Sequence, residues 1–303
     1  MSLQRRDFMP AFFTHYAFGI KNYKKLEDGA LKRIIREHKK VYSLGTIGPD
    51  IFFYYFPDMR FHEKKPGSVL HEKHSQLFFE NMLKRAELFS KRDQKIAYAY
   101  IAGFIGHYEL DVHCHPFVYE ETAAKKRYVQ YAEHFALENA MDVFCCYEHL
   151  HRLPTELNQR DLIRLSQREK HIISTLLADA FNATYHEPKQ TRFRITCILD
   201  VMGLVILALK DKRGRKEWVW KRLEKVLLGH VITAPLFINN NTYGYDIEDW
   251  YIFHLFFIEG QREYKSIMPY LEQYIVKRGD RSQVRRMLLD KIGNHSYHKG
   301  KVF

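Results

Sequence analysis

The sequence is poor in proline, glycine and cysteine. It has nine prolines and 15 glycines in 303 residues, which is fewer turn-forming residues than a fold of many short strands needs. Its four cysteines show no spaced framework, and two of them, Cys145 and Cys146, are neighbours that rarely reach disulfide geometry. These scarcities argue against a many-stranded β fold and against a disulfide-stapled secreted domain. They predict a protein of a reducing, cytoplasmic compartment.

Long apolar runs are also missing. The most apolar stretch, residues 195–209, contains Asp200 and is too short to cross a bilayer. The apolar stretch after Arg6 is interrupted by His15, and no small-residue cleavage site follows it. We therefore expect a soluble chain without a transmembrane segment and without a secretory signal peptide.

Acidic residues are outnumbered, with 36 Asp and Glu against 48 Lys and Arg, so the formal net charge is +12. This balance favours anionic partners such as nucleic acid, anionic lipid or a phosphate ester, although a solvated basic surface without such a partner is equally expected. Hydrophobic residues make up 46% of the chain, which is enough for a sizeable core.

What the chain has throughout is helical periodicity, with apolar residues recurring at spacings of three and four. No segment alternates strictly, so we predict an all-α fold. The expected helices cover residues 26–40, 70–90, 94–115, 119–149, 155–182, 191–211, 216–229, 247–259, 262–278 and 281–292. The expected loops cover residues 43–69, 183–190 and 231–246. We expect a metal-binding helical core over 1–152 and a helical extension over 153–303 packed on it, together one continuous domain. The sequence assigns neither a role to the extension nor an oligomeric state.

The stretch GHYELDVHCHPF, residues 106–117, holds the clearest candidate ligands. His107, Asp111 and His115 are four residues apart and therefore share one face of a helix. Imidazole and carboxylate donors in such a row are typical of zinc sites. Pro116 is expected to end this helix near Cys114 or His115, because proline disfavours a helical continuation.

A second pair, His134 and Glu138, repeats the spacing of four residues, and Asp142 lies one turn further as a supporting acceptor. Either pair alone is an ordinary feature of a solvated helix surface. Two such pairs, together with His115 beside a proline, favour a metal site.

Several other candidates stand alone in the first half of the chain. His15 is either a core histidine or a ligand, and Asp50, which follows Gly-Pro, is either a turn residue or a ligand. His62, His71 and His74 form a cluster from which the residues alone select no ligand.

In this order, TH (14–15), LGTIGPDIFFYY (44–55), GSVLHEKHS (67–75), GHYELDVHCHPF (106–117) and HFALE (134–138) resemble the zinc-dependent phospholipase C family. That family includes secreted bacterial phospholipases C, the catalytic domain of alpha-toxin and an uncharacterised cytoplasmic bacterial branch. The resemblance covers roughly residues 8–150. It implies a multi-helix bundle of the phospholipase C and P1 nuclease type, here with additional C-terminal helices.

The resemblance also implies up to three zinc ions. The first would use Asp50, His71, His107 and Asp111. The second would use His115, His134 and Glu138, and the third would use His15 and share Asp111. Among the clustered histidines the family pattern favours His71, because it follows Gly-Ser-Val.

The implied activity is hydrolysis of a phosphate ester, including a phospholipid headgroup, by a zinc-activated water that attacks phosphorus. Asp50 or Glu138 would take the proton of that water. The alternatives are a nuclease or nucleotide phosphatase on the same metals, or a non-catalytic domain that metal staples together. The N-terminal tryptophan that completes the third zinc site in the secreted enzymes has no counterpart near the start of this chain. We therefore expect two firmly held zinc ions and a third that is held weakly or not at all.

Overall fold

A computed structural model describes residues 12–54, 66–122, 127–185, 187, 189–231, 233–244, 247–297 and 300. These residues form helices and connecting segments, and none of them lies in a β-strand apart from an isolated backbone bridge between Lys210 and Ile238. The predicted all-α fold is confirmed.

The first half of the chain forms α1 (Phe12–Lys25), α2 (Ala30–Glu37), α3 (Lys39–Gly45), η1 (Gly48–Tyr54), α4 (Pro66–Glu72), α5 (Ser75–Glu87), α6 (Lys91–Thr122), α7 (Arg127–Cys145) and η3 (Cys146–Leu150). The second half forms η4 (Pro154–Glu156), α8 (Gln159–Leu162), α9 (Gln167–Thr184), α10 (Arg192–Leu209), α11 (Arg215–Leu228), η5 (Ala234–Leu236), α12 (Ile247–Val276) and α13 (Ser282–Ile292).

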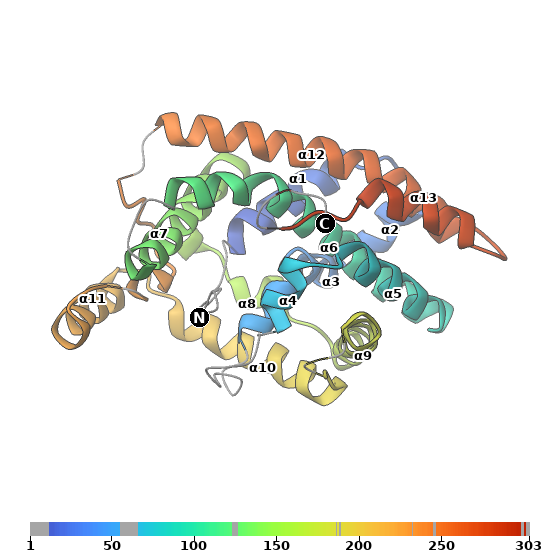
Figure 1. The fold of residues 1–303 in the computed structure, drawn as a ribbon, viewed down its shortest axis with the longest axis horizontal. Helices are drawn as coiled ribbons and strands as arrows, with labels where there is room; N and C mark the ends of the chain where they lie inside the picture. The colour runs from blue at the N-terminus through green and yellow to red at the C-terminus, as the bar shows by residue number, and fades with distance from the viewer. Residues whose placement is uncertain are drawn as a thin grey trace.

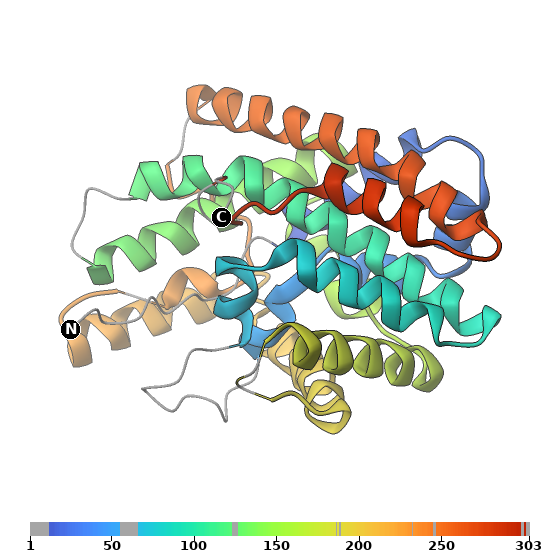
Figure 2. The same cartoon turned by 45° about the vertical axis from the view of Figure 1, so that its right-hand side comes forward.

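The longest helix, α6, runs through the middle of the molecule (Figures 1 and 2). Every side chain from residue 96 to residue 111 is buried, because this part of α6 carries small and apolar residues on all its faces. The helices α3, α7, α9 and α12 pack around it. A helix that is surrounded in this way can present polar side chains to the interior, and those side chains are positioned rigidly.

The contact between α3 and α6 depends on two glycines. A Cβ atom on Gly45 would overlap the carbonyl oxygen of Tyr100, and one on Gly103 would overlap the carbonyl oxygen of Tyr42. Without these Cβ atoms the two backbones approach each other directly. The approach matters for the site described below, because α3 leads into η1.

We expect Gly103→Ala to lower the free energy of unfolding by about 2–3 kcal/mol, since the new methyl group must displace backbone rather than a flexible side chain. Gly203→Ala is the matched control. It lies inside α10, and the nearest atom to its Cβ would be 3.5 Å away on Arg160. There the same change is expected to be neutral or to stabilise by about 0.5–1 kcal/mol. Urea unfolding measures both variants, and equal stabilities would contradict the role of Gly103.

The helix boundary expected at Pro116 is wrong. The helix α6 continues to Thr122 with Pro116 inside it. Phe117 and Val118, directly after the proline, are 6% and 0% exposed. Burial of these side chains outweighs the hydrogen bond that proline removes.

Other boundaries also differ from the expected ones. The two helices expected over 247–259 and 262–278 are one helix, α12, in which Gly260 lies against the carbonyl of Glu109 on α6. The range 26–40 is divided between α2 and α3, and 155–182 is divided between η4, α8 and α9. The expected helix over 119–149 is divided among the end of α6, α7 and η3, and the expected loop over 43–69 contains η1 and the start of α4.

The second half of the chain packs directly on the first. The helix α9 contacts α5 and α6, α12 contacts α6, and α10 contacts η1. Figure 1 shows α12 and α13 along one side of α6 and α10 along the other. Among the described helices, none has an apolar stretch long enough to cross a membrane.

Candidate metal centre

The predicted row on α6 points to one place in the interior, and Asp111 lies at its middle. His107 Nε2 is 2.9 Å from Asp111 Oδ2, and His115 Nε2 is 3.6 Å from Asp111 Oδ1. Two further imidazoles reach the same carboxylate from other helices. His15 Nε2 on α1 lies 3.2 Å from Oδ1, and His71 Nε2 on α4 lies 3.6 Å from Oδ2. Four imidazoles thus surround one buried carboxylate.

Asp50 approaches this cluster from η1. Its Oδ1 is 3.2 Å from His71 Nε2, and its Oδ2 is 3.7 Å from His107 Nδ1. The turn that places Asp50 begins at Gly48, which has φ +52° and lies so close to His107 that a Cβ would come within 2.5 Å of the ring. Both the backbone conformation and the space therefore require glycine there. The Gly-Pro-Asp sequence is what brings this carboxylate to α6.

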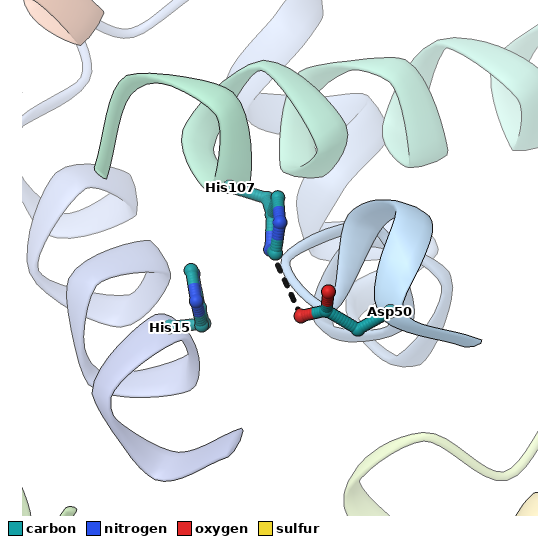
Figure 3. Close-up of side chains that lie close together, drawn as sticks. All are labelled: His15, Asp50 and His107. Atoms are coloured by element: carbon teal, nitrogen blue, oxygen red, sulfur yellow. Dashed lines mark ion pairs between the residues drawn. The ribbon is translucent and has the colours of Figure 1, made fainter. Parts of the chain in front are cut away.

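Figure 3 shows His15, Asp50 and His107 converging from α1, η1 and α6. The rings of His15 and His107 stack with their centroids 4.1 Å apart. The ligand atoms of these three residues lie within 4.8 Å of one another, and so do those of His71, His107 and Asp111. His107 is shared by both groups, so the two make one continuous cluster.

The second predicted pair, on α7, joins the cluster through His115. His134 Nε2 is 2.9 Å from Glu138 Oε1, and His115 Nε2 is 3.9 Å from the same oxygen. The structure therefore brings together five imidazoles and three carboxylates that the sequence singled out. They are His15, Asp50, His71, His107, Asp111, His115, His134 and Glu138.

Backbone carbonyls orient two of the imidazoles. His71 Nδ1 is 2.8 Å from the carbonyl oxygen of Gly67, and His107 Nδ1 is 3.1 Å from that of Thr46. A ring that donates from Nδ1 to a carbonyl keeps its lone pair on Nε2, and each Nε2 points at the carboxylates. Such partners fix a histidine for metal binding.

Asp142, which the sequence suggested as a supporting acceptor, holds the segment that carries His15. Its Oδ1 accepts hydrogen bonds from the backbone N–H and the hydroxyl of Thr14, at 2.7 and 2.8 Å. Burial raises the pKa of the Asp142 carboxyl to about 7, although the hydrogen bonds from this segment oppose that rise. These hydrogen bonds attach the first turn of α1 to α7.

The charges of the centre depend on burial and on mutual contacts. Burial would raise the pKa of Asp111, but the imidazoles of His107, His115 and His15 hold it well below its usual range. Burial would lower the pKa of His71, but Asp111 and Asp50 raise it to about 10. An ionised Asp111 thus attracts positive charge, which without a metal is supplied by protonated imidazole.

The part of the centre on α7 has different charges. Burial lowers the pKa of His115 to about 4, so this ring is neutral at pH 7 and has a lone pair for a metal. Burial raises the pKa of the Glu138 carboxyl, and His134 only partly offsets this rise.

The donor set fits zinc. Four carboxylate oxygens, both of Asp50, Oδ2 of Asp111 and Oε2 of Glu138, are buried and receive no well-formed hydrogen bond from the described residues. Buried carboxylate oxygens without a hydrogen-bond partner are costly, and a bound cation would offset that cost. Mixed imidazole and carboxylate ligands at neutral pH are those that zinc prefers.

Two other histidines of this region, among the described residues, lie apart from the cluster. His74, at φ 63°, contacts Tyr185, and His113 Nδ1 is 2.7 Å from the carbonyl oxygen of Glu109. His62 lies outside the described residues. Cys114 is a buried thiol whose pKa burial raises well above its usual range.

Tyr297 is the residue at this centre that sequence reasoning missed. Its ring centroid lies 4.9 Å from that of His71 and 6.0 Å from that of His107, and its backbone N–H donates to the carbonyl of His71. The segment after α13 runs back toward the middle of the molecule, as Figures 1 and 2 show. No motif marks Tyr297, because its role follows only from this return of the chain.

The all-α scaffold thus carries buried groups of imidazoles and carboxylates that could hold a metal ion. The chain belongs to the family described as zinc dependent phospholipase C, whose sequence model matches residues 14–190. The match extends past the resemblance noted above, as far as the end of α9 and the segment that follows it. Comparisons with curated proteins and with solved structures found no match.

Proposed function

We propose that this chain is a zinc-dependent phosphoric ester hydrolase with phospholipase C-like chemistry. The observation that carries the proposal is the buried carboxylate of Asp111, which four imidazoles from three different helices approach within 3.6 Å. A purely structural role would not require so many charged groups in the interior, where each must be compensated.

The proposed ligand sets are those that the resemblance to the family implies, and contacts among their members support them. Asp50, His71, His107 and Asp111 would hold one zinc ion, and His115, His134 and Glu138 would hold a second. A third would lie beside His15, which contacts Asp111 and stacks on His107. Fewer side chains remain for this third position, so it would be the weakest.

When bound, the zinc ions would stabilise the negative charge that develops on the phosphoryl group and would acidify the attacking water. The chain itself would supply the proton acceptor. Glu138 is the better candidate, because burial raises the pKa of its carboxyl, and Asp50 is the alternative. The carbonyls of Thr46 and Gly67 would hold the imidazoles in place through the reaction.

A small pocket beside Glu138 is the candidate position for the substrate. Its walls come from α7, η5 and the end of η1, and aromatic side chains contribute to them: Phe12, Tyr54 and Phe135. Glu138 and Asp142, one turn apart on α7, also line it. Its volume of about 50 Å³ is far below that of a pocket for a drug-sized ligand, so it would admit only part of an ester.

The test is a measurement of metal content followed by a substrate panel. Protein purified without an affinity tag is expected to contain zinc by mass spectrometry, and to hydrolyse nitrophenyl phosphocholine slowly. Phosphatidylcholine vesicles, single-stranded DNA and nucleotides complete the panel. Glu138→Gln is expected to lower turnover at least about 100-fold, the range of one general base. The matched control is His113→Ala, which removes a histidine on α6 that lies outside the cluster.

Each outcome of the substrate panel supports one of the candidate functions. Turnover of the DNA or nucleotides without turnover of the choline esters would make the protein a nuclease or nucleotide phosphatase. Full zinc with no turnover of any ester would leave the metal as a structural staple, and it would overturn the proposal.

A further inference from the structure

The helix α11 buries acidic side chains and exposes apolar ones, which is the reverse of an ordinary amphipathic helix. Of its 14 residues only Glu217 and Glu224 are buried. An amphipathic surface helix normally buries its apolar side and leaves its charges in water. Here the apolar side chains are left outside, although they would be the first to be covered in a protein that stays in solution.

The two glutamates attach α11 to the rest of the chain. Glu217 accepts hydrogen bonds from Asn239 and from the hydroxyl of Tyr243, at 2.7 and 2.9 Å. Glu224 accepts from the backbone N–H groups of Thr233 and Ala234, at 2.8 and 3.1 Å. These hydrogen bonds fix which side of α11 faces the rest of the chain. The exposure of the opposite, apolar side is therefore a consequence of specific contacts.

Apolar side chains form a stripe along the outer side of α11. They recur at spacings of three and four and therefore share a face. The most exposed are Val226 and Leu227, at 82% and 75%. The stripe consists of Val219, Trp220, Leu223, Val226 and Leu227. Leu204 and Leu207, near the end of α10, are also exposed. Lys216 links this end of α10 to α11 by donating to the carbonyls of Ala208 and Lys210.

Basic side chains accompany this stripe. The exposed ones on α11 are Arg215, Lys221, Arg222 and Lys225, together with Lys216, whose ammonium group already bonds the carbonyls of Ala208 and Lys210. Arg222 lies 3.6 Å from the ring centroid of Trp218, which is 55% exposed. Because both acidic residues of the helix are turned inward and bonded, the outer side of α11 carries positive charge only.

We infer that α11 is a membrane-docking helix that lies on an anionic phospholipid surface. Its stripe would enter the boundary between headgroups and acyl chains, its tryptophans would sit at that boundary, and its basic side chains would contact lipid phosphates. The occupant is a lipid surface because the charge complements anionic headgroups along the whole helix. A second copy of this chain, with its net charge of +12, would bring like charges together.

The position of α11 relates it to the metal centre. Asn139, the residue after Glu138 on α7, contacts the hydroxyl of Tyr243, which in turn donates to Glu217. A membrane bound at α11 would therefore lie next to the helix that carries two of the candidate ligands. The inference does not rest on the proposed hydrolase function, because docking requires no chemistry at the centre.

The experiment uses the intact protein and two kinds of vesicle. Sucrose-loaded vesicles of phosphatidylserine and phosphatidylcholine are expected to sediment the protein at 0.1 M salt, and pure phosphatidylcholine vesicles are expected to bind it at least tenfold more weakly. Raising the salt to 0.5 M is expected to weaken the first interaction. Trp218 and Trp220 are exposed while Trp250 is buried, so a blue shift of tryptophan fluorescence on binding reports on α11 directly.

A matched pair of variants separates the helix from general charge. Val226→Glu combined with Leu227→Glu is expected to weaken binding to the anionic vesicles at least tenfold. Leu88→Glu combined with Val276→Glu makes the same change in net charge at side chains that are 77% and 55% exposed. Those two positions lie at the opposite end of the molecule in Figure 1, at the ends of α5 and α12. This control is expected to bind within twofold of the unchanged protein.

Three results would overturn the inference. They are no sedimentation with anionic vesicles at 0.1 M salt, an equal loss of binding in both variants, or a dimer in solution that only the α11 variant converts to monomer. The last result would identify the stripe as a self-association surface. Because binding is measured without turnover, failure here leaves the hydrolase proposal untouched, and failure of the substrate panel leaves the docking result untouched.

Discussion

Replacing Asp111 with asparagine is expected to remove more zinc than any single histidine substitution at the centre. The carboxylate contacts four imidazoles and would be shared between ions, so its loss affects more than one site. An amide oxygen is a weaker and uncharged ligand, and it would leave the surrounding imidazoles without their anionic partner. We expect turnover to fall at least 1000-fold, which corresponds to about 4 kcal/mol. Bound zinc is measured by mass spectrometry and turnover with nitrophenyl phosphocholine.

Glu109→Gln on the same helix is the matched control. Glu109 is 4% exposed and contributes to the interface with α12 rather than to the centre. Burial and the neighbouring Glu263 raise the pKa of its carboxyl well above the usual range. Glutamine is nearly isosteric with the side chain it replaces. Its zinc content and turnover are expected to remain unchanged. If Asp111→Asn kept its full zinc while His134→Ala lost it, the shared role of Asp111 would be wrong.

Removing the metal altogether is expected to abolish hydrolysis and to destabilise the fold. Each zinc ion present at about 100 times its Kd stabilises the folded chain by about 2.7 kcal/mol. Loss of two ions should therefore lower the melting temperature by roughly 10–20 °C, at 2–4 °C per kcal/mol. Chelation followed by calorimetry measures this change.

Stepwise return of zinc then counts the sites. We expect turnover to recover with the first two equivalents and to rise further only in the micromolar range, where the weaker third site fills. His15→Ala is expected to lose that second rise alone, since His15 contacts Asp111 without belonging to either of the other two ligand sets. A single phase in both proteins would show that His15 supports no separate site.

Much of the candidate site was predictable because the spacing of residues within one helix determines which side chains share a face. His107, Asp111 and His115 share a helix face for reasons that involve only α-helical geometry, and the same holds for His134 and Glu138. His71 and Asp50 were selected through the ordered motifs of the family. In the structure they approach the same carboxylate cluster, whereas His74, three residues beyond His71, lies elsewhere.

Helix boundaries were less predictable, because tertiary packing competes with local signals. Pro116 should end a helix on local grounds, yet burial of Phe117 and Val118 carries α6 onward. The expected break between residues 259 and 262 disappears because Gly260 is a contact point with α6 rather than an interruption. In both places long-range contacts outweigh a local preference of a few kcal/mol.

The sequence by itself determined the all-α class, the identity of the family and the rows of imidazole and carboxylate side chains, because each depends on periodicity within one segment or on the order of short motifs. Only the tertiary structure decided that α1, η1, α4, α6 and α7 meet at Asp111, that Tyr297 returns to cover His71, and that α11 turns its glutamates inward and its apolar stripe outward. The physical reason is that these arrangements join residues far apart along the chain. Helical periodicity shows which side chains share a face, but the partner of that face is chosen by packing over the whole molecule.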